Sequence, residues 1–308
     1  MPGQLKEVRN RIVSVKKTQQ ITKAMKLVAA SKLRKAQDRI IKIRPYADKL
    51  YGIMGNLMSG GDSGGGMAFG TQRPAENILI ILVTSDRGLC GAFNSSISKM
   101  VRNTINTQYA QQKASGNVTL MFIGKKGYDL LKREPVKLNT DYINLFQDLN
   151  FDDSAALAEL IMQQFLSKQY DIIHVAYNQF KNQIVQIPLV DTFLPVVKLE
   201  KPDIAKKSSA KNAGNAPKED IKPDYLYEPD KEQILKELVP KILKTQFFRY
   251  LLDSNTSEQG ARMTSMDNAT NNAEELLRDL SIQYNRARQA AITTEITEIV
   301  SGAAALQG

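Results

Sequence analysis

The stretch LKEVRNRIVSVKKTQQITKAMKLVAASKLRKAQDRIIKIR, residues 5–44, carries apolar side chains at steps of three and four. They are Leu5, Val8, Ile12 and Val15, and then Ala29, Leu33, Ala36, Ile40 and Ile43. This spacing gathers them into one stripe along a helix, and such a stripe is buried against a partner helix. We therefore expect one long helix from about Leu5 to Tyr51, ended by the glycines that follow.

The same helix holds the charge excess of the chain. The first 44 residues contain 13 Lys or Arg and only two acids, Glu7 and Asp38, whereas the other 264 residues contain 29 bases and 30 acids. A basic surface of this kind fits nucleic acid, an acidic helix or an acidic socket in another protein. The net charge of +10 therefore describes one segment and not the body of the protein.

A second stripe occupies the C-terminal part of the chain. Its members are Met266, Ala269, Ala273, Leu276, Leu280, Gln283, Ala287 and Ala290. Asp230, with Gln233 three residues later, predicts a helix start, and the helical pattern continues to about Ser301 with Pro240 as a kink or a boundary. From Glu258 onward there are seven acids and four bases. We expect this mildly acidic helix to pair antiparallel with the basic one.

Between the two helices the periodicity changes. Residues 77–85 read NILIILVTS, an apolar run of strand length that predicts a strand covered on both faces. Further strands are expected at 118–123, 171–177 and 183–192, the last antiparallel at an edge, and helices at 95–112, 125–132 and 153–167. Strands that alternate with helices predict a largely parallel sheet.

The fold class is therefore α/β: a long antiparallel coiled coil of N- and C-terminal helices with an inserted Rossmann-like α/β domain. The expected divisions are an N-terminal coiled-coil helix at 1–58, a flexible glycine-rich loop at 59–75, the α/β domain at 76–199, a mobile polar loop at 200–224 and a C-terminal coiled-coil helix at 225–308.

Few residues suit catalysis or metal binding. Cys90 is the single cysteine and His174 the single histidine, so we expect no disulfide, no metal site and no cofactor, and we expect both side chains to be packing residues. We recognise no signal peptide and no apolar run long enough to cross a bilayer, which favours a cytoplasmic protein.

The turn Arg87-Gly-Leu-Cys-Gly91 follows the first strand and could be read as a phosphate-binding loop of a small α/β nucleotide-using enzyme. It has two glycines in G-x-x-G spacing and lacks both the three-glycine dinucleotide pattern and a Gly-Lys-Ser/Thr sequence. We expect a structural turn between a strand and a helix, and no catalytic residue here.

The C-terminal end lacks positive charge. The last 20 residues, after Arg288, contain no Lys or Arg and only two acids, Glu295 and Glu298. An uncharged projecting helix end is poorly suited to water, so we expect it to enter a socket in another protein.

Four segments, in the same order along the chain, carry a resemblance to the gamma subunit of F-type ATP synthases. They are ITKAMKLVAASK at 21–32, SDRGLCG at 85–91, YLYEPD at 225–230 and ITTEITEIVSGAAA at 292–305. The resemblance covers essentially the whole chain and implies a central rotor stalk. Its partners would be the alpha, beta and epsilon subunits and the ring of c subunits, with delta in the same complex, and catalysis would belong to beta.

The resemblance also implies contact residues. For the alpha/beta hexamer these would be Arg288, Gln289 and Thr293 near the tip, with Met25 and Lys26 opposite them on the first helix, together with Glu295 and Glu298. For epsilon and the c-ring they would be Tyr225, Tyr227 and Glu228. The implied location is peripheral, on the cytoplasmic face of the bacterial inner membrane, with membrane contact through the c-ring. A nucleic-acid-binding coiled-coil arm remains the alternative that the basic helix leaves open.

Overall fold

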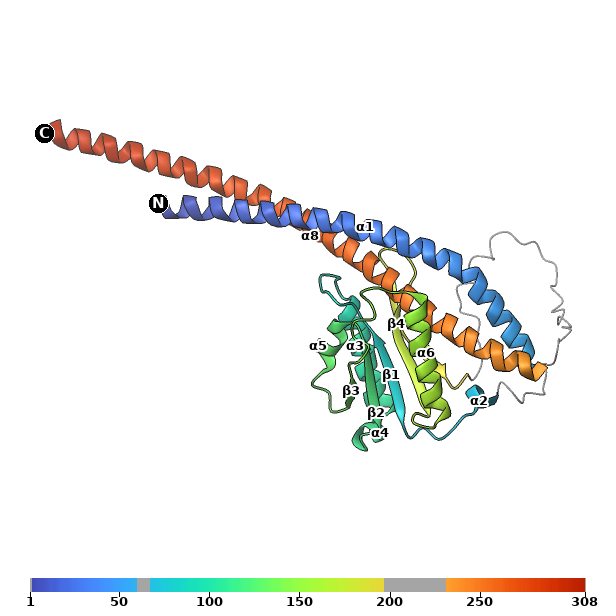
Figure 1. Ribbon diagram of the computed structural model, residues 1–308. Helices are drawn as coiled ribbons and strands as arrows, with labels where there is room; N and C mark the ends of the chain where they lie inside the picture. The colour runs from blue at the N-terminus through green and yellow to red at the C-terminus, as the bar shows by residue number, and fades with distance from the viewer. Residues whose placement is uncertain (1, 60–66, 197–230, 308) are drawn as a thin grey trace, which may run out of the picture. The chain divides into compact units, whose positions relative to one another are not determined.

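The computed structural model describes residues 2–59, 67–196 and 231–307 (Figure 1). The predicted polar loop at 200–224 and helix cap at Asp230 lie outside the described residues. The elements follow one another as α1 (Pro2–Ser59), α2 (Met67–Gly70), β1 (Ile78–Val83), α3 (Phe93–Gln108), α4 (Ala110–Ala114), β2 (Val118–Ile123), α5 (Lys125–Leu131), β3 (Lys137–Asn139), α6 (Phe151–Leu166), β4 (Ile172–Phe180), β5 (Gln186–Leu194) and α8 (Lys231–Gln307).

The described residues form two compact units, which we treat separately. The helix-pair unit contains residues 2–33, 89–91 and 259–307, and the α/β unit contains residues 34–59, 67–88, 92–196 and 231–258. Both α1 and α8 contribute to each unit.

The α/β unit is built on one five-stranded sheet in the order β3-β2-β1-β4-β5. β1 is parallel to both β2 and β4, and β5 is antiparallel to β4. The predicted parallel sheet with an antiparallel strand at one edge is confirmed. The sequence pattern missed β3, because three residues are too few to show a period.

Alternate residues of β1 enter two separate cores, as a strand covered on both faces requires. Leu79, Ile81 and Val83 join one core with α6, α8 and the later part of α1, where Ile40 and Leu50 are buried. The core on the opposite face of the sheet is completed by buried side chains of α3 and α5 (Figure 1).

Both long helices continue through residues that were expected to end them or, for Pro240, to kink or end them. α1 continues past Gly52 and Gly55 to Ser59, and α8 contains Pro240 without a boundary. A glycine costs a helix only about 1 kcal/mol, which packing can outweigh. Pro240 is flanked by Val239, Ile242 and Leu243, all buried in the core, so packing holds the backbone helical although one N–H donor is missing.

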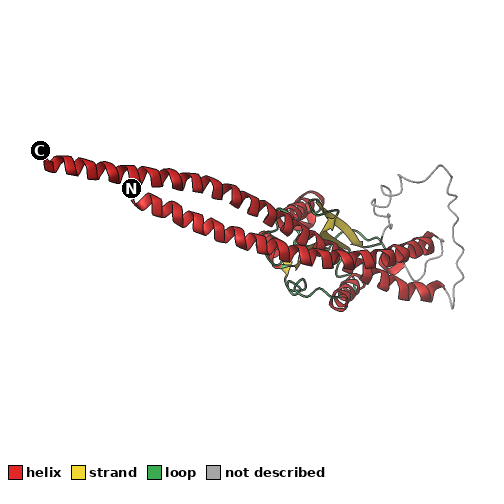
Figure 2. Ribbon diagram, turned by 90° about the horizontal axis from the view of Figure 1, so that it is seen from above, coloured by secondary structure: helices red, strands yellow, loops and turns green. Residues whose placement is uncertain are grey.

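In the helix-pair unit, which holds residues 2–33 and 259–307, α1 and α8 lie side by side, and the last part of α8 extends beyond α1 (Figure 2). Ala29 and Leu33 of α1 are buried, as are Met266, Ala273 and Leu280 of α8. These residues belong to the two stripes recognised in the sequence. The predicted fold class, an antiparallel pair of terminal helices with an inserted α/β domain, is confirmed.

Candidate functional site: polar contacts of the helix pair and of the sheet edge

The helix-pair unit contains a polar layer between α1 and α8. The hydroxyl groups of Thr22 and Thr270 lie 2.8 Å apart, and Thr22 is only 8% exposed. One turn further along α1, the Lys26 Nζ donates to Asp267 Oδ1 at 2.5 Å. The residue number rises on α1 as it falls on α8, which fixes both the antiparallel direction and the register of the pair.

This register corrects one expectation about the contact residues. Met25 and Lys26 were expected opposite Arg288, but Lys26 lies opposite Asp267, which precedes Arg288 by 21 residues. At 1.5 Å per residue the two positions are about 32 Å apart along the helix. The error has a simple physical cause: a 3-4 repeat fits its partner equally well at every shift of seven residues.

The remaining predicted contact residues in the described part of α8 are exposed. Arg288, Gln289, Thr293, Glu295 and Glu298 all face solvent. The end of α8 extends beyond the end of α1 (Figure 2). Four large apolar side chains near this end, Ile292, Ile296, Ile299 and Val300, are 45–71% exposed. The described end of α8 therefore exposes both polar and apolar side chains. It lies at a different position along the helix pair from Met25 and Lys26. Tyr225, Tyr227 and Glu228 lie outside the described residues.

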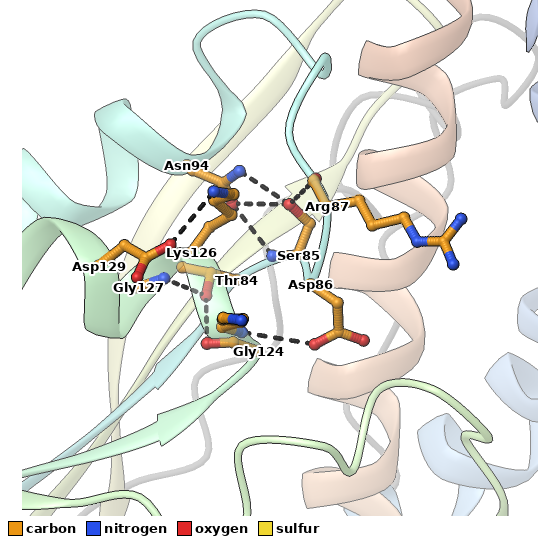
Figure 3. Close-up of polar contacts among 10 residues, drawn as sticks. Thr84, Ser85, Asp86, Arg87, Asn94, Gly124, Lys126, Gly127 and Asp129 are labelled. Carbon is orange, nitrogen blue, oxygen red and sulfur yellow. Dashed lines mark hydrogen bonds and ion pairs between the residues drawn. The ribbon is translucent and has the colours of Figure 1, made fainter.

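The second polar cluster lies where β1 ends, between its two parallel neighbours. In doubly wound sheets a ligand enters the crevice at this switch point. Here the position is filled by the chain itself (Figure 3). The Thr84 hydroxyl donates to Gly124 O at 3.1 Å and accepts the Gly127 N–H at 2.8 Å, so the ends of β1 and β2 and the start of α5 are joined.

Ser85 and Asn94 close the other side of the same position. Asn94 Oδ1 accepts from the Ser85 N–H at 3.0 Å, and Asn94 Nδ2 donates to Ser85 Oγ at 2.7 Å. Both residues are buried. Beside them, burial raises the pKa of Asp86, although the Lys125 N–H and the charge of Arg87 oppose the shift. The hydroxyl groups of Thr84 and Ser85 and the Ser85 amide are therefore engaged within the chain, which favours a structural turn over a phosphate-binding loop.

Gly124 shows how closely the strand ends approach. It has φ +96°, and a Cβ built there would lie 2.0 Å from Thr84 O. Only glycine fits such a position. This close approach leaves no space for a ligand between the ends of β1 and β2 at this position.

The two residues with reactive side chains are packing residues, as predicted. Cys90 is buried. His174 is 7% exposed, with Nε2 2.6 Å from the Tyr109 hydroxyl and Nδ1 3.3 Å from the Thr192 hydroxyl. Burial lowers the pKa of His174 to about 4, and a hydrogen bond to the backbone of Asp191 opposes this only in part. Among the described residues no three His, Cys, Asp or Glu side chains lie close enough together to hold a metal ion.

Sequence reasoning missed several polar residues that organise these sites. Thr22 falls at a stripe position in the gap between Val15 and Ala29, and a polar residue at such a position was the signal that could have found it. Asp267 and Thr270 lie beside the α8 stripe and gave no such signal. The buried serine and threonine residues of α8 between Asp253 and Glu258 were missed for a different reason. They read as a solvated surface, and only the tertiary structure buries them.

The comparisons with known proteins agree with this architecture. A family model described as ATP synthase matches residues 4–306. The ATP synthase gamma chain of Cytophaga hutchinsonii is 48% identical, with 99% of each chain covered. That of Chloroherpeton thalassium is 46% identical, with 98% of each chain covered.

Two solved structures share the fold. The central stalk and c-ring structure of Tetrahymena thermophila mitochondrial ATP synthase contains a chain that is 27% identical, with a TM-score of 0.55, covering 81% of this chain and 99% of that one. A chain in the OSCP/F1/c-ring structure of the Euglena gracilis mitochondrial enzyme is 20% identical with a TM-score of 0.62, covering 99% and 95%, and supports the fold alone.

A pair of terminal helices with an inserted α/β domain is thus the fold class of ATP synthase central stalks. With relatives of 44–48% identity along its whole length, the chain belongs to the family of ATP synthase gamma chains. No helix in the described ranges is both long and apolar enough to cross a membrane.

Proposed function

We propose that the chain is the central-stalk rotor of an F-type ATP synthase and couples ion-driven rotation of the c-ring to ATP synthesis, or to hydrolysis in reverse. Its partners are the alpha, beta and epsilon subunits and the c-ring, with delta in the same complex. The observation that carries the proposal is the full-length match to gamma chains together with an exposed helix end on α8.

The proposed mechanism is mechanical, and the chain itself is not catalytic. A pair of unlike helices has no threefold symmetry, so inside a ring of three equivalent sites it contacts each site differently. A ligand shifts a conformational equilibrium only by its differential affinity for the two states, and the same holds for a rod. Rotation of the rod therefore gives each beta subunit in turn the conformation that favours ATP.

We infer that the contacts with the hexamer form at two levels. Met25 is half-buried and Lys26 is bound to Asp267, so these two residues mark a lower level on the helix pair. Arg288, Gln289, Thr293, Glu295 and Glu298 form the upper level near the end of α8. The basic surface of α1, which includes exposed Lys16, Lys17 and Lys23, would face acidic loops of the ring.

Tyr225, Tyr227 and Glu228 are proposed to contact epsilon and the c-ring, on the strength of the family resemblance. The chain would then be a peripheral protein on the cytoplasmic face of the inner membrane and would touch the bilayer only through the c-ring.

The test is coexpression with the alpha and beta subunits, followed by purification and a rotation assay. We expect one copy of the chain for three alpha/beta pairs and ATP-driven rotation of a bead attached to the chain. Isolation as a lone monomer with salt-sensitive RNA affinity would instead support the coiled-coil arm.

The contact residues are tested in the same complex. We expect Arg288→Ala with Thr293→Ala to lower the torque, whereas Arg278→Ala should change it less, because Arg278 is an exposed arginine below the upper level that pairs with Glu274 of the same helix. Equal effects of the two substitutions would reject the assignment of an upper contact level while leaving the rotor function standing.

A further inference from the structure

A buried hydrogen bond joins α8 to the sheet of the α/β unit. The Ser257 hydroxyl donates to the backbone carbonyl of Asn178, near the end of β4, at 2.9 Å. Ser257 is completely buried and Asn178 is 1% exposed. Because both residues are buried, water does not compete for this hydrogen bond and does not weaken it.

The acceptor of this bond is one that the sheet cannot satisfy. On the β5 side, Asn178 pairs with Pro188, which has no N–H, so this is a non-hydrogen-bonded pair and the Asn178 carbonyl faces β1. On the β1 side, the ladder ends at the pair Leu82 and Ala176, two residues before Asn178, and the next amide in register, that of Ser85, donates to Asn94. A buried carbonyl without a donor is unfavourable, so the Ser257 hydroxyl occupies a position that the end of β1 leaves open.

The connection continues beyond β4. The Asn178 side chain donates to Phe93 O at 3.4 Å, in the first turn of α3, and the next residue, Asn94, is bound to Ser85 at the end of β1. One chain of buried hydrogen bonds therefore runs from α8 through β4 and α3 to β1. It occupies the switch point at which related sheets bind ligands.

The apolar contacts between α8 and the sheet are different in kind. Leu243, Phe247 and Leu251 pack in the core, with the rings of Phe247 and Phe193 5.7 Å apart. Apolar contact is non-directional and allows a helix to turn or slide with little loss until the side chains clash. A hydrogen bond requires one distance and one angle, so it resists small rotations of α8 about its axis.

We propose that Ser257 is a positioning residue that fixes α8 against the sheet and so transmits torque between the α/β unit and α8. This inference rests on the proposed rotor function. Ser257 would keep the helix from slipping under load, and it would have no role in assembly or in the rate of ATP hydrolysis.

The experiment measures rotation under load in the assembled alpha/beta complex. A bead is attached to the α/β unit through a cysteine introduced at exposed Thr107, with Cys90 changed to Ser, and alpha and beta are fixed to the surface. Ser257→Val and Ser257→Thr have nearly the same shape and differ by the hydroxyl. With a large bead we expect Ser257→Val to complete at least twofold fewer turns per ATP hydrolysed than Ser257→Thr, and with a small bead we expect the two to be equal.

The matched control is Ser254→Ala. Ser254 lies on the same helix and is also completely buried, but its hydroxyl has no hydrogen-bond partner among the described residues. We expect this variant to turn under load as the unaltered chain does. Equal turns per ATP for Ser257→Val and Ser257→Thr would overturn the proposal. Absence of rotation with the unaltered chain would instead remove the rotor function on which the proposal depends.

Discussion

The buried histidine predicts a loss of stability in mild acid that one substitution can isolate. His174 has a pKa of about 4 in the folded protein, against about 6.5 in the unfolded chain, because burial disfavours the imidazolium. The unfolded state therefore binds the proton first as the pH falls. Stability from this group is complete above pH 6.5 and is lost as the pH decreases toward 4.

The magnitude follows from the two pKa values. Each unit of difference is worth 1.36 kcal/mol, and between pH 7.5 and pH 5 the proton binding to the unfolded chain lowers the free energy of unfolding by about 2 kcal/mol. His174→Gln keeps a side chain that can hydrogen-bond to the Tyr109 hydroxyl but removes the titration. Its free energy of unfolding should therefore depend less on pH in this range.

Urea unfolding of both proteins at a series of pH values provides the measurement. Near-ultraviolet circular dichroism follows the α/β unit, because its tyrosines Tyr109, Tyr177 and Tyr250 are buried. Asp86 and Asp191, whose pKa values burial raises, are present in both proteins and cancel in the difference. If the two free energies of unfolding fall in parallel from pH 7.5 to pH 5, the imidazole is not desolvated in the way that the structure indicates.

Two further predictions concern packing and charge. Gly124→Ala should lower the free energy of unfolding by about 3 kcal/mol or more, since its Cβ would overlap Thr84 O, whereas Gly116→Ala, also at positive φ but with nothing within 4 Å, should lose only about 1 kcal/mol. Similar losses measured by urea unfolding would contradict the close approach. For Lys26 and Asp267, whose side chains are 34% and 43% exposed, a double-mutant cycle should give a coupling energy below about 1 kcal/mol that decreases in 0.5 M salt. A larger, salt-independent coupling would mean that the pair is desolvated.

Much of the fold could be read from periodicity. The apolar run at 78–83 and the stripes of the two long helices each repeat one local rule many times, so that single exceptions such as Gly52 or Pro240 do not hide it. The short strand β3 offers no repetition and was missed. Whether a long helix or strand forms is thus set by the local sequence pattern, whereas the residues at which it begins and ends depend on packing.

The candidate site divides in the same way. The chemical types of the contact residues near the C-terminus were visible in the sequence, but their alignment with Met25 and Lys26 was wrong, because a heptad pattern contains no absolute register. That register depends on contacts such as those of Thr22 with Thr270. The Ser257 contact is less visible still, since its acceptor, the backbone carbonyl of Asn178, is 79 residues away in sequence and is left open because the ladder with β1 ends before it.

The end of β1 also explains why a rotor would use a hydrogen bond at this position of the sheet and not another. Within a regular ladder every strand carbonyl already has a donor, so a serine on a packed helix would have nothing to bind and would be unfavourable to bury. The ladder between β1 and β4 ends at Leu82 and Ala176, and the next amide in register with Asn178, that of Ser85, donates to Asn94 instead. The buried polar segment of α8 lies where this opening occurs, and the helix gains a directional bond without the loss of a ladder hydrogen bond.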